Sequence, residues 1–162
     1  MKPKEINLDL LKMMSFLVLV LIGFSCAGPQ QTAGINDAAA PLDARIIEIK
    51  TNLSPKDAYK KTAQVLQDNG FALANTDETL MSITTEPRTF DGVSGRGVED
   101  IVISASIREG EKTKVVLQGT YNFMDSDSDI KKTGQNGSIS RKLWIRLHNL
   151  ATDFGGELNY RK

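Results

Sequence analysis

Hydrophobic and polar residues alternate most regularly in the second half of the chain, over residues 101–107 and 114–121. A period of two places the apolar side chains on one face of a strand. These apolar faces consist of Ile101, Ile103, Ala105 and Ile107 in the first segment, and of Val115, Leu117, Gly119 and Tyr121 in the second. A Glu109-Gly110-Glu111 turn joins the segments, so the pattern predicts a β-hairpin with one apolar face.

Three shorter runs predict further strands: residues 45–51, which are rich in β-branched residues, and residues 71–75 and 80–85, which are joined by a turn at Asp77-Glu78. In the first of them, Ile47 and Ile49 face the core, and the charged residues beside them face solvent. The predicted strands 71–75, 80–85, 101–107 and 114–121 follow one another along the chain, so we expect them to form antiparallel hairpins with one face open to solvent.

A helical period replaces the alternation in two segments. The first helix is expected to start at Ser54, a good N-cap before a proline, and to stop at Asn69-Gly70. Its apolar face contains Tyr59, Thr62, Ala63 and Leu66, widened by Ala58 and Val65. The second helix starts at Ser138 or Ser140 and ends at Gly155-Gly156. Its apolar stripe contains Leu143, Leu147, Leu150, Ala151 and Phe154.

The predicted order β-α-β-β-β-β-α indicates an α+β fold. We expect a two-layer sandwich, with an antiparallel sheet of about five strands and both helices on one face. Residues 89–98 and 124–137 are predicted as loops, and the residues after the second helix as a polar tail.

An apolar run precedes this domain. Residues 13–24 contain a single serine among mostly large apolar side chains. Three lysines, Lys2, Lys4 and Lys12, precede this run. A helix of this length rises about 18 Å, less than the roughly 30 Å hydrocarbon core of a bilayer. The run therefore predicts an export signal rather than a membrane-spanning helix.

The run ends in Ile22-Gly23-Phe24-Ser25-Cys26, which resembles the lipobox of bacterial lipoproteins. The resemblance covers the first 26 residues, and it implies that Cys26 receives a diacylglyceryl group and becomes the new N-terminus. The sequence departs from the family pattern at Gly23, where leucine is usual, and at Phe24, which is bulky. Ala27 follows the cysteine in place of aspartate, which by the enteric sorting rule implies the outer membrane, facing the periplasm.

The predicted organisation has three parts: a signal peptide over residues 1–25, lipidated Cys26 with a flexible tether over 26–43, and one globular domain over 44–162. The tether is predicted because its residues are small, polar and punctuated by proline and glycine. The alternative is an ordinary secretory signal cut after Ala27, which would release a soluble periplasmic protein. Lipidation accounts for the position of the only cysteine, which the alternative leaves to coincidence.

Composition excludes several classes of function. The chain has 20 basic and 20 acidic residues, so no basic field would attract nucleic acid. With one histidine and one cysteine, no metal site can be built from these two residue types, and we expect no cofactor. With Cys26 lipidated, no disulfide is available and the fold must rest on packing alone.

Two polar segments resemble ligand loops in part. Asp125-Ser-Asp-Ser-Asp129 alternates carboxylates as calcium loops do, but Ile130 and Asn136 stand where an EF-hand needs glycine and glutamate. We interpret it as a solvated loop. Gly92-Val-Ser-Gly-Arg-Gly97 lies between predicted strands and lacks the Gly-Lys-Ser/Thr ending of a phosphate loop. It is interpreted as a plain connection or as a loop that touches a partner.

Two single residues of the second helix were candidates for a site. His148 is the only histidine, it lies one residue past Leu147 and off the apolar stripe, and no nucleophile or orienting partner is evident for it. We predict that it is exposed or half-buried. Trp144, beside the stripe, is predicted to lie in the core or at its edge.

Three classes of function are compatible with these observations. The leading prediction is a lipid-anchored, non-catalytic envelope lipoprotein that binds or supports another envelope component. The second is a carrier of a small apolar ligand between helices and sheet. The third is an enzyme or an enzyme inhibitor, which the absence of a catalytic constellation disfavours. Residues 54–85 resemble the helix-grip domains of an outer-membrane barrel-assembly lipoprotein in the order of their predicted elements: a helix, Asn69-Gly-Phe71, a strand, an acidic turn and the strand Ser82-Ile-Thr-Thr85. That resemblance bears on the fold.

Overall fold

The predicted hairpin is the longest pair of strands in the structure. The computed structural model describes residues 39–90, 98–123 and 126–162, and in it the hairpin consists of β5 (Val98–Arg108) and β6 (Thr113–Phe123). The apolar face predicted for β5 is buried, and so are Val115 and Leu117 on β6. The alternation therefore assigned the two faces of the hairpin correctly.

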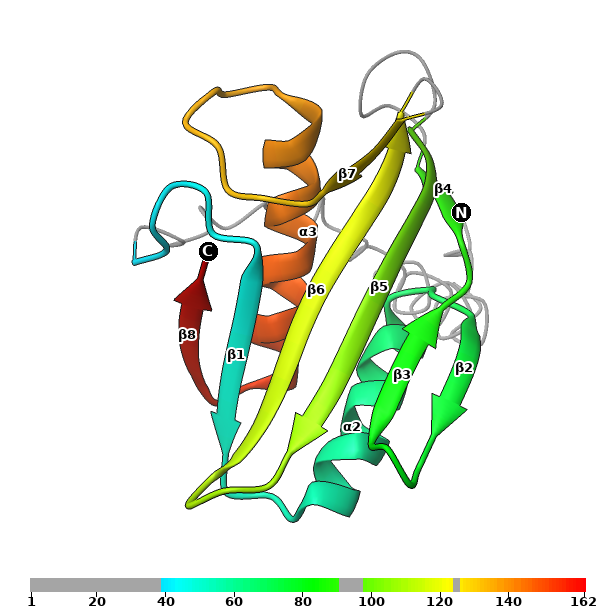
Figure 1. Ribbon diagram of the computed structural model, residues 1–162, viewed down its shortest axis with the longest axis vertical. Helices are drawn as coiled ribbons and strands as arrows, with labels where there is room; N and C mark the ends of the chain where they lie inside the picture. The colour runs from blue at the N-terminus through cyan, green and yellow to red at the C-terminus, as the bar shows by residue number, and fades with distance from the viewer. Residues whose placement is uncertain (1–38, 91–97, 124–125) are drawn as a thin grey trace, which may run out of the picture. The chain divides into compact units, whose positions relative to one another are not determined.

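Shorter strands pair along both sides of this hairpin (Figure 1). They are β1 (Ile46–Thr51), β2 (Leu73–Asp77), β3 (Ser82–Thr85), β4 (Arg88–Phe90), β7 (Ser126–Asp129) and β8 (Glu157–Arg161). β3 and β4 pair with β5, whereas β1 and β7 pair with β6. The main path of the sheet runs β2-β3-β5-β6-β1-β8, and every pairing is antiparallel.

The sequence predicts loops or a tail where β4, β7 and β8 lie, and these three predictions are wrong. β7 has the sequence Ser-Asp-Ser-Asp, so it carries no apolar residue that could signal a strand. β4 has only three residues and β8 only five. In each case pairing with a neighbouring strand that is already in place decides the structure, because strand preference depends strongly on context.

Two helices, α2 (Pro55–Asp68) and α3 (Ile139–Phe154), pack on one face of the sheet, which confirms the predicted α+β sandwich. Ser54 caps α2 by accepting a hydrogen bond from the Asp57 amide at 3.2 Å. Ser138, rather than Ser140, caps α3 by accepting from the Arg141 amide at 3.2 Å. Gly155 ends α3 with φ of 77°, a conformation that favours glycine.

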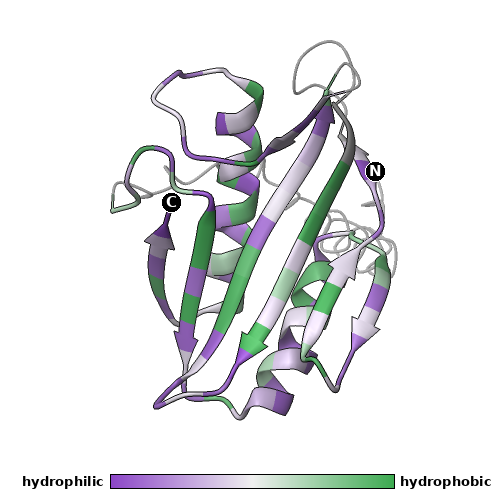
Figure 2. Ribbon diagram, in the orientation of Figure 1, coloured by the Kyte–Doolittle hydropathy of each residue, from purple (hydrophilic) through white to green (hydrophobic). Residues whose placement is uncertain are grey.

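The core lies between the helices and the inner face of the sheet. Figure 2 shows apolar and polar positions alternating along β1, β5 and β6, as one buried and one open face require. The largest fully buried side chains are Trp144, Phe154, Ile47, Ile49, Leu66, Ile83, Ile101, Ile103, Ile130, Leu143 and Leu147. Trp144 is therefore a core residue, as predicted. Ala40 and Ala44, which precede β1, are also buried.

Gly119 of β6 makes room for one of these core residues. A Cβ atom at Gly119 would come within 2.7 Å of Cδ1 of Ile130, the residue that follows β7. The Ile130 amide donates a hydrogen bond to the Gly119 carbonyl at 2.8 Å. The absent side chain thus leaves room for Ile130, which lies beside Gly119, to place its side chain in the core.

Within the part of the chain that the structure describes, neither helix has the length and apolar character needed to cross a bilayer.

We expect Leu147→Asp to lower the free energy of unfolding of the domain by about 4 kcal/mol or more, because it places a charge at a position that is 1% exposed. The matched control is Asn149→Asp, which introduces the same carboxylate at an exposed position of the same helix. Urea denaturation followed by circular dichroism measures both variants. Equal effects would contradict the assigned facing of α3.

Candidate functional site

Several residues singled out from the sequence lie outside the described residues. These are Cys26, the whole Gly92–Gly97 segment and Asp125. Their predicted roles stay predictions.

The remaining aspartates of the acidic segment belong to β7 and contact separate partners. Asp129 Oδ2 accepts a hydrogen bond from Nη1 of Arg45 at 2.8 Å, and Asp127 accepts from the Asn122 side chain at 3.1 Å. The segment is thus part of the sheet over residues 126–129, and the prediction of a loop there is wrong. In the described residues no three or more histidine, cysteine, aspartate or glutamate side chains are grouped so that they could hold a metal ion.

His148 is buried, which contradicts the prediction that it is exposed or half-buried. Only 5% of its surface is exposed. Its Nε2 lies 3.0 Å from the hydroxyl of Tyr160, and the two rings are stacked at 7° with centroids 6.0 Å apart. The reason is β8, which brings Tyr160 beside α3 where the sequence predicts only a tail. The arrangement indicates that His148 helps hold β8 against α3.

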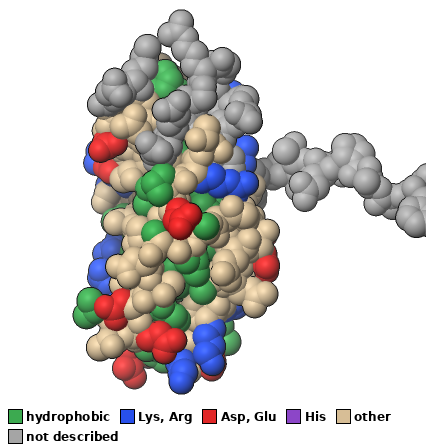
Figure 3. All heavy atoms as spheres, turned by 90° about the vertical axis from the view of Figure 1, so that its right-hand side faces the viewer, with side chains coloured by type: hydrophobic (Ala, Val, Ile, Leu, Met, Phe, Trp, Pro, Cys, Tyr) green, Lys and Arg blue, Asp and Glu red, His purple; other side chains and the backbone are tan. Residues whose placement is uncertain are grey.

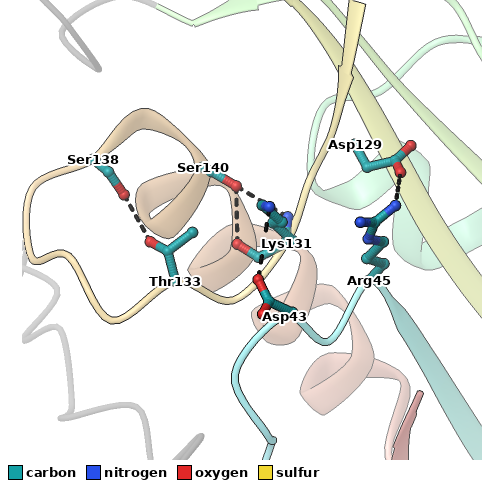
Figure 4. Close-up of polar contacts among 7 residues, drawn as sticks. All are labelled: Asp43, Arg45, Asp129, Lys131, Thr133, Ser138 and Ser140. Carbon is teal, nitrogen blue, oxygen red and sulfur yellow. Dashed lines mark hydrogen bonds and ion pairs between the residues drawn. The ribbon is translucent and has the colours of Figure 1, made fainter. Parts of the chain in front are cut away.

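A polar network holds the segment before β1 against the loop before α3 (Figure 4). In this network Arg45 pairs with Asp129, and Lys131 Nζ lies 3.6 Å from Asp43 Oδ1. Ser140 Oγ accepts from the Lys131 amide at 3.1 Å and donates to the Lys131 carbonyl at 2.9 Å. These contacts fix the end of the domain at which the preceding chain enters.

Backbone hydrogen bonds reinforce the same junction. The Asp43 amide donates to the Lys132 carbonyl, and the Lys132 amide donates to the Ala44 carbonyl, each at 2.9 Å. Lys132 Nζ also donates to the Ala40 carbonyl. Because amide and carbonyl groups are paired on both segments, residues 40–45 form part of the folded domain.

The face of the sheet opposite the helices carries mostly short polar side chains over its centre, together with Val102 and the buried Val116. Its outward residues there are Ser82, Thr84, Val102, Ser104, Ser106, Val116, Gln118 and Thr120. Figure 1 views the sheet from this side. No helix covers this face among the described residues, so it is a surface on which a partner could lie.

A row of charged residues crosses this open face near the β5–β6 turn. The register places Arg108 opposite Lys114, Lys114 opposite Lys50, and Lys50 opposite Glu157. Three cations therefore stand on adjacent strands at directly opposed positions, which is unfavourable unless negative charge is near. Glu48, 3.6 Å from Lys114, and Glu157, 3.4 Å from Lys50, supply part of that charge.

The row lines a hollow of about 480 Å³ at the end of the sheet. Its lining residues are Glu48, Lys50, Arg108, Glu109, Gly110, Glu111, Lys112, Lys114, Glu157 and Arg161. Arg108, Lys112 and Arg161 form no ion pair within the described residues. We call this set of ten residues the charged hollow. It contains five basic and four acidic side chains.

One carboxylate of the charged hollow has a perturbed pKa. The pKa of Glu157 lies below its ordinary value because the Asn159 side chain donates a hydrogen bond to it and because Lys50 is close. The carboxylate therefore stays charged to lower pH than a free glutamate does. The opposite charges of Glu157 and Lys50 thus face each other at neutral and at mildly acidic pH.

The interior offers much less space. The cavity lined by residues of α2, β6 and α3, among them Leu66, Leu117 and Phe154, has a volume of about 10 Å³. Binding sites for small molecules usually enclose about 300–1,000 Å³. A ligand at this place would have to separate the helices from the sheet.

Another side of the molecule exposes some apolar surface. Figure 3 looks from the β2 side and shows apolar side chains in a band between polar ones. Leu80, in the turn between β2 and β3, is 73% exposed, and Leu73 and Met81 are partly buried against the core. Single exposed apolar residues are normal on protein surfaces, so this side carries less information than the charged hollow.

His148→Ala is expected to cost about 2–4 kcal/mol of unfolding free energy, because it leaves a cavity and removes a partner of the Tyr160 hydroxyl. Tyr160→Phe keeps the ring and removes one hydroxyl, so it should cost about 1 kcal/mol. Thermal or urea unfolding of the two variants and of the double variant measures both losses and their coupling. A negligible effect of His148→Ala would show that the ring does not hold β8 in place.

A scan against models of known protein families finds no family that matches this chain, and a search of curated proteins finds no matching relative.

Proposed function

We propose that this chain is a lipid-anchored, non-catalytic lipoprotein of the bacterial cell envelope whose domain binds another envelope protein. The observation that carries the proposal is the position of Cys26. The only cysteine of the chain ends an apolar run and precedes a small, polar segment that leads to the folded domain. This is the arrangement that a lipidated N-terminal cysteine on a tether requires.

The physical strength of such an anchor depends on the number of acyl chains. Each buried CH₂ group contributes about 0.8 kcal/mol, and a single chain gives only reversible membrane binding. By its resemblance to the lipoprotein family, Cys26 would carry two or three chains, which is enough for stable attachment. Ala27 after the cysteine supports the outer membrane, on its periplasmic side, as the destination.

The architecture of the domain supports protein binding along β1 and at the β5–β6 turn. β1 begins beside the junction of residues 40–45, and two of its residues, Glu48 and Lys50, line the charged hollow. Arg161, which lies opposite Ile46 at the start of β1, lines it as well. The charged hollow therefore extends along β1 and β8 to the β5–β6 turn, beside which β1 ends.

The chemistry of the charged hollow favours an acidic segment of a protein as its partner. Arg108 and Lys112 are cations that form no ion pair within the described part of the chain. Arginine binds carboxylates through two parallel hydrogen bonds, which adds orientation to charge. The short hydroxyl side chains that continue along the open face would let a partner approach the sheet closely.

Ligand transport is the weaker of the binding functions considered. An apolar cargo would need a cavity between the helices and the sheet, and the space there is about 10 Å³. The close packing of α2, α3 and β6 therefore supports recognition on the surface over storage in the interior.

The Cys26 anchor is tested by the mass of the mature protein. We expect wild-type protein to carry acyl groups on an N-terminal Cys26 and to enter the detergent phase of a cloud-point separation. Cys26→Ser should accumulate as the uncleaved precursor, because the lipoprotein peptidase needs the lipid-modified cysteine. An unmodified chain that begins at Gly28 would instead establish ordinary secretion.

Partner binding at the charged hollow is tested by reversing its charge. Proteins that co-purify with the wild-type chain from solubilised envelopes should be lost with Arg108→Glu combined with Lys114→Glu, and they should be released by raised salt. The matched control is Lys60→Glu combined with Lys56→Glu, which makes the same charge change at two exposed positions of α2. If both double variants retain the same proteins, the charged hollow is not the binding site.

A further inference from the structure

β8 is an edge strand whose outer side has no strand partner among the described residues. It pairs only with β1, as the last strand of the sheet order, and Figure 1 shows it as the outermost strand on its side of the sheet. The five pairs that it makes with β1, from Glu157 with Lys50 to Arg161 with Ile46, run without a register shift. A regular edge of this kind is a template for pairing with a further strand.

The sequence of β8, Glu157-Leu-Asn-Tyr-Arg161, has opposite charges at equal distances from its centre. Glu157 and Arg161 are both exposed and lie on the same face of the sheet as Asn159, because they are two and four residues apart. Leu158 and Tyr160 lie on the other face, and both are partly buried against the core. The strand is therefore self-complementary about Asn159.

We propose that two copies of this chain associate by antiparallel pairing of β8 with β8, with Asn159 of one copy opposite Asn159 of the other. This register places Glu157 opposite Arg161 of the second copy, and Arg161 opposite Glu157 of the second copy. Leu158 meets Tyr160 of the second copy on the other face, which covers the remaining exposed surface of both side chains. The two sheets become one continuous sheet with a two-fold axis at Asn159, the symmetry that closed homodimers use.

Charged residues on an edge strand also protect proteins against unwanted pairing, and here the signs of the charges decide between the two roles. A strand protected by lysines repels a second copy of itself, because like charges meet in the antiparallel register. In β8 the same register brings together two glutamate–arginine pairs. Lys50 lies 3.4 Å from Glu157 within one chain, and a carboxylate has acceptor sites for both cations.

The other edge of the sheet lacks these properties. β2 pairs with β3 through a register shift between Leu73 and Asn75, and such irregularities twist an edge strand away from further pairing. Its only charged residue is Asp77, so antiparallel pairing about the central Asn75 would form no ion pair. Asn75 of β2 is therefore a matched control for Asn159 of β8, since each is the central asparagine of a five-residue edge strand.

Cysteine crosslinking of the full chain in its membrane tests the pairing. Residues directly opposed in antiparallel strands have Cα atoms about 4.5–5.5 Å apart, which is within the range that a disulfide spans. With a mild oxidant added, Asn159→Cys should give a covalent dimer on a non-reducing gel, at least about tenfold more than Asn75→Cys. The wild-type chain, whose only cysteine is Cys26, supplies the background. Equal yields at the two positions would overturn the proposal.

Charge reversal tests the register. In the Asn159→Cys background, Glu157→Arg and Arg161→Glu should each lower the dimer yield about tenfold, because like charges then face each other. Co-expression of these two variants with different tags should restore the yield as a mixed dimer, since both contacts again join an arginine to a glutamate. That recovery also shows that both variants fold. Single reversals without effect, or a mixed dimer that does not recover, would overturn the pairing about Asn159.

Discussion

The structure depends on the burial of one face of the β5–β6 hairpin against the two helices. Ile103 and Leu117 are at most 3% exposed, and they meet α2 and α3 through side chains such as Leu66 and Leu147 that are equally buried. Because side chains alternate along a strand, a slip of one residue would exchange this apolar face for the outward serines and glutamine. The apolar face thus holds the hairpin in register, and the hairpin holds the strands on both of its sides.

The same register creates the charged row on the opposite face. Lys50, Arg108 and Lys114 come from three strands, and they become neighbours only because Ile49, Ile107 and Val115 are neighbours on the buried side. Burial of the apolar side chains is worth far more than the repulsion between three cations at the surface costs. An unfavourable arrangement of like charges can therefore persist on the surface, where Glu48 and Glu157 relieve part of it.

The elements that the sequence predicted correctly carry their information locally. Ser54, Asn69 and Gly155 mark helix ends through their own backbone preferences, and the hairpin is evident from its own alternation. β8 and the burial of His148 were missed because both depend on distant residues: β8 pairs with β1, more than 100 positions earlier, and His148 is covered by Tyr160 of β8. The charged row was missed for the same reason, since the signal for it lies in a register between strands.

The way in which the domain fills its interior bears on where it can bind. Because the chain has one cysteine, no disulfide can form within the domain, and packing must stabilise it. Residues such as Trp144 and Ile130 fill the space between the helices and the sheet. The side chain of Ile130 has room only because Gly119 beside it carries no side chain. A core packed to this degree stabilises one arrangement of the two layers and leaves little space between them. The binding that we propose is therefore assigned to surfaces that the two layers do not cover, which are the open face of the sheet and its edges.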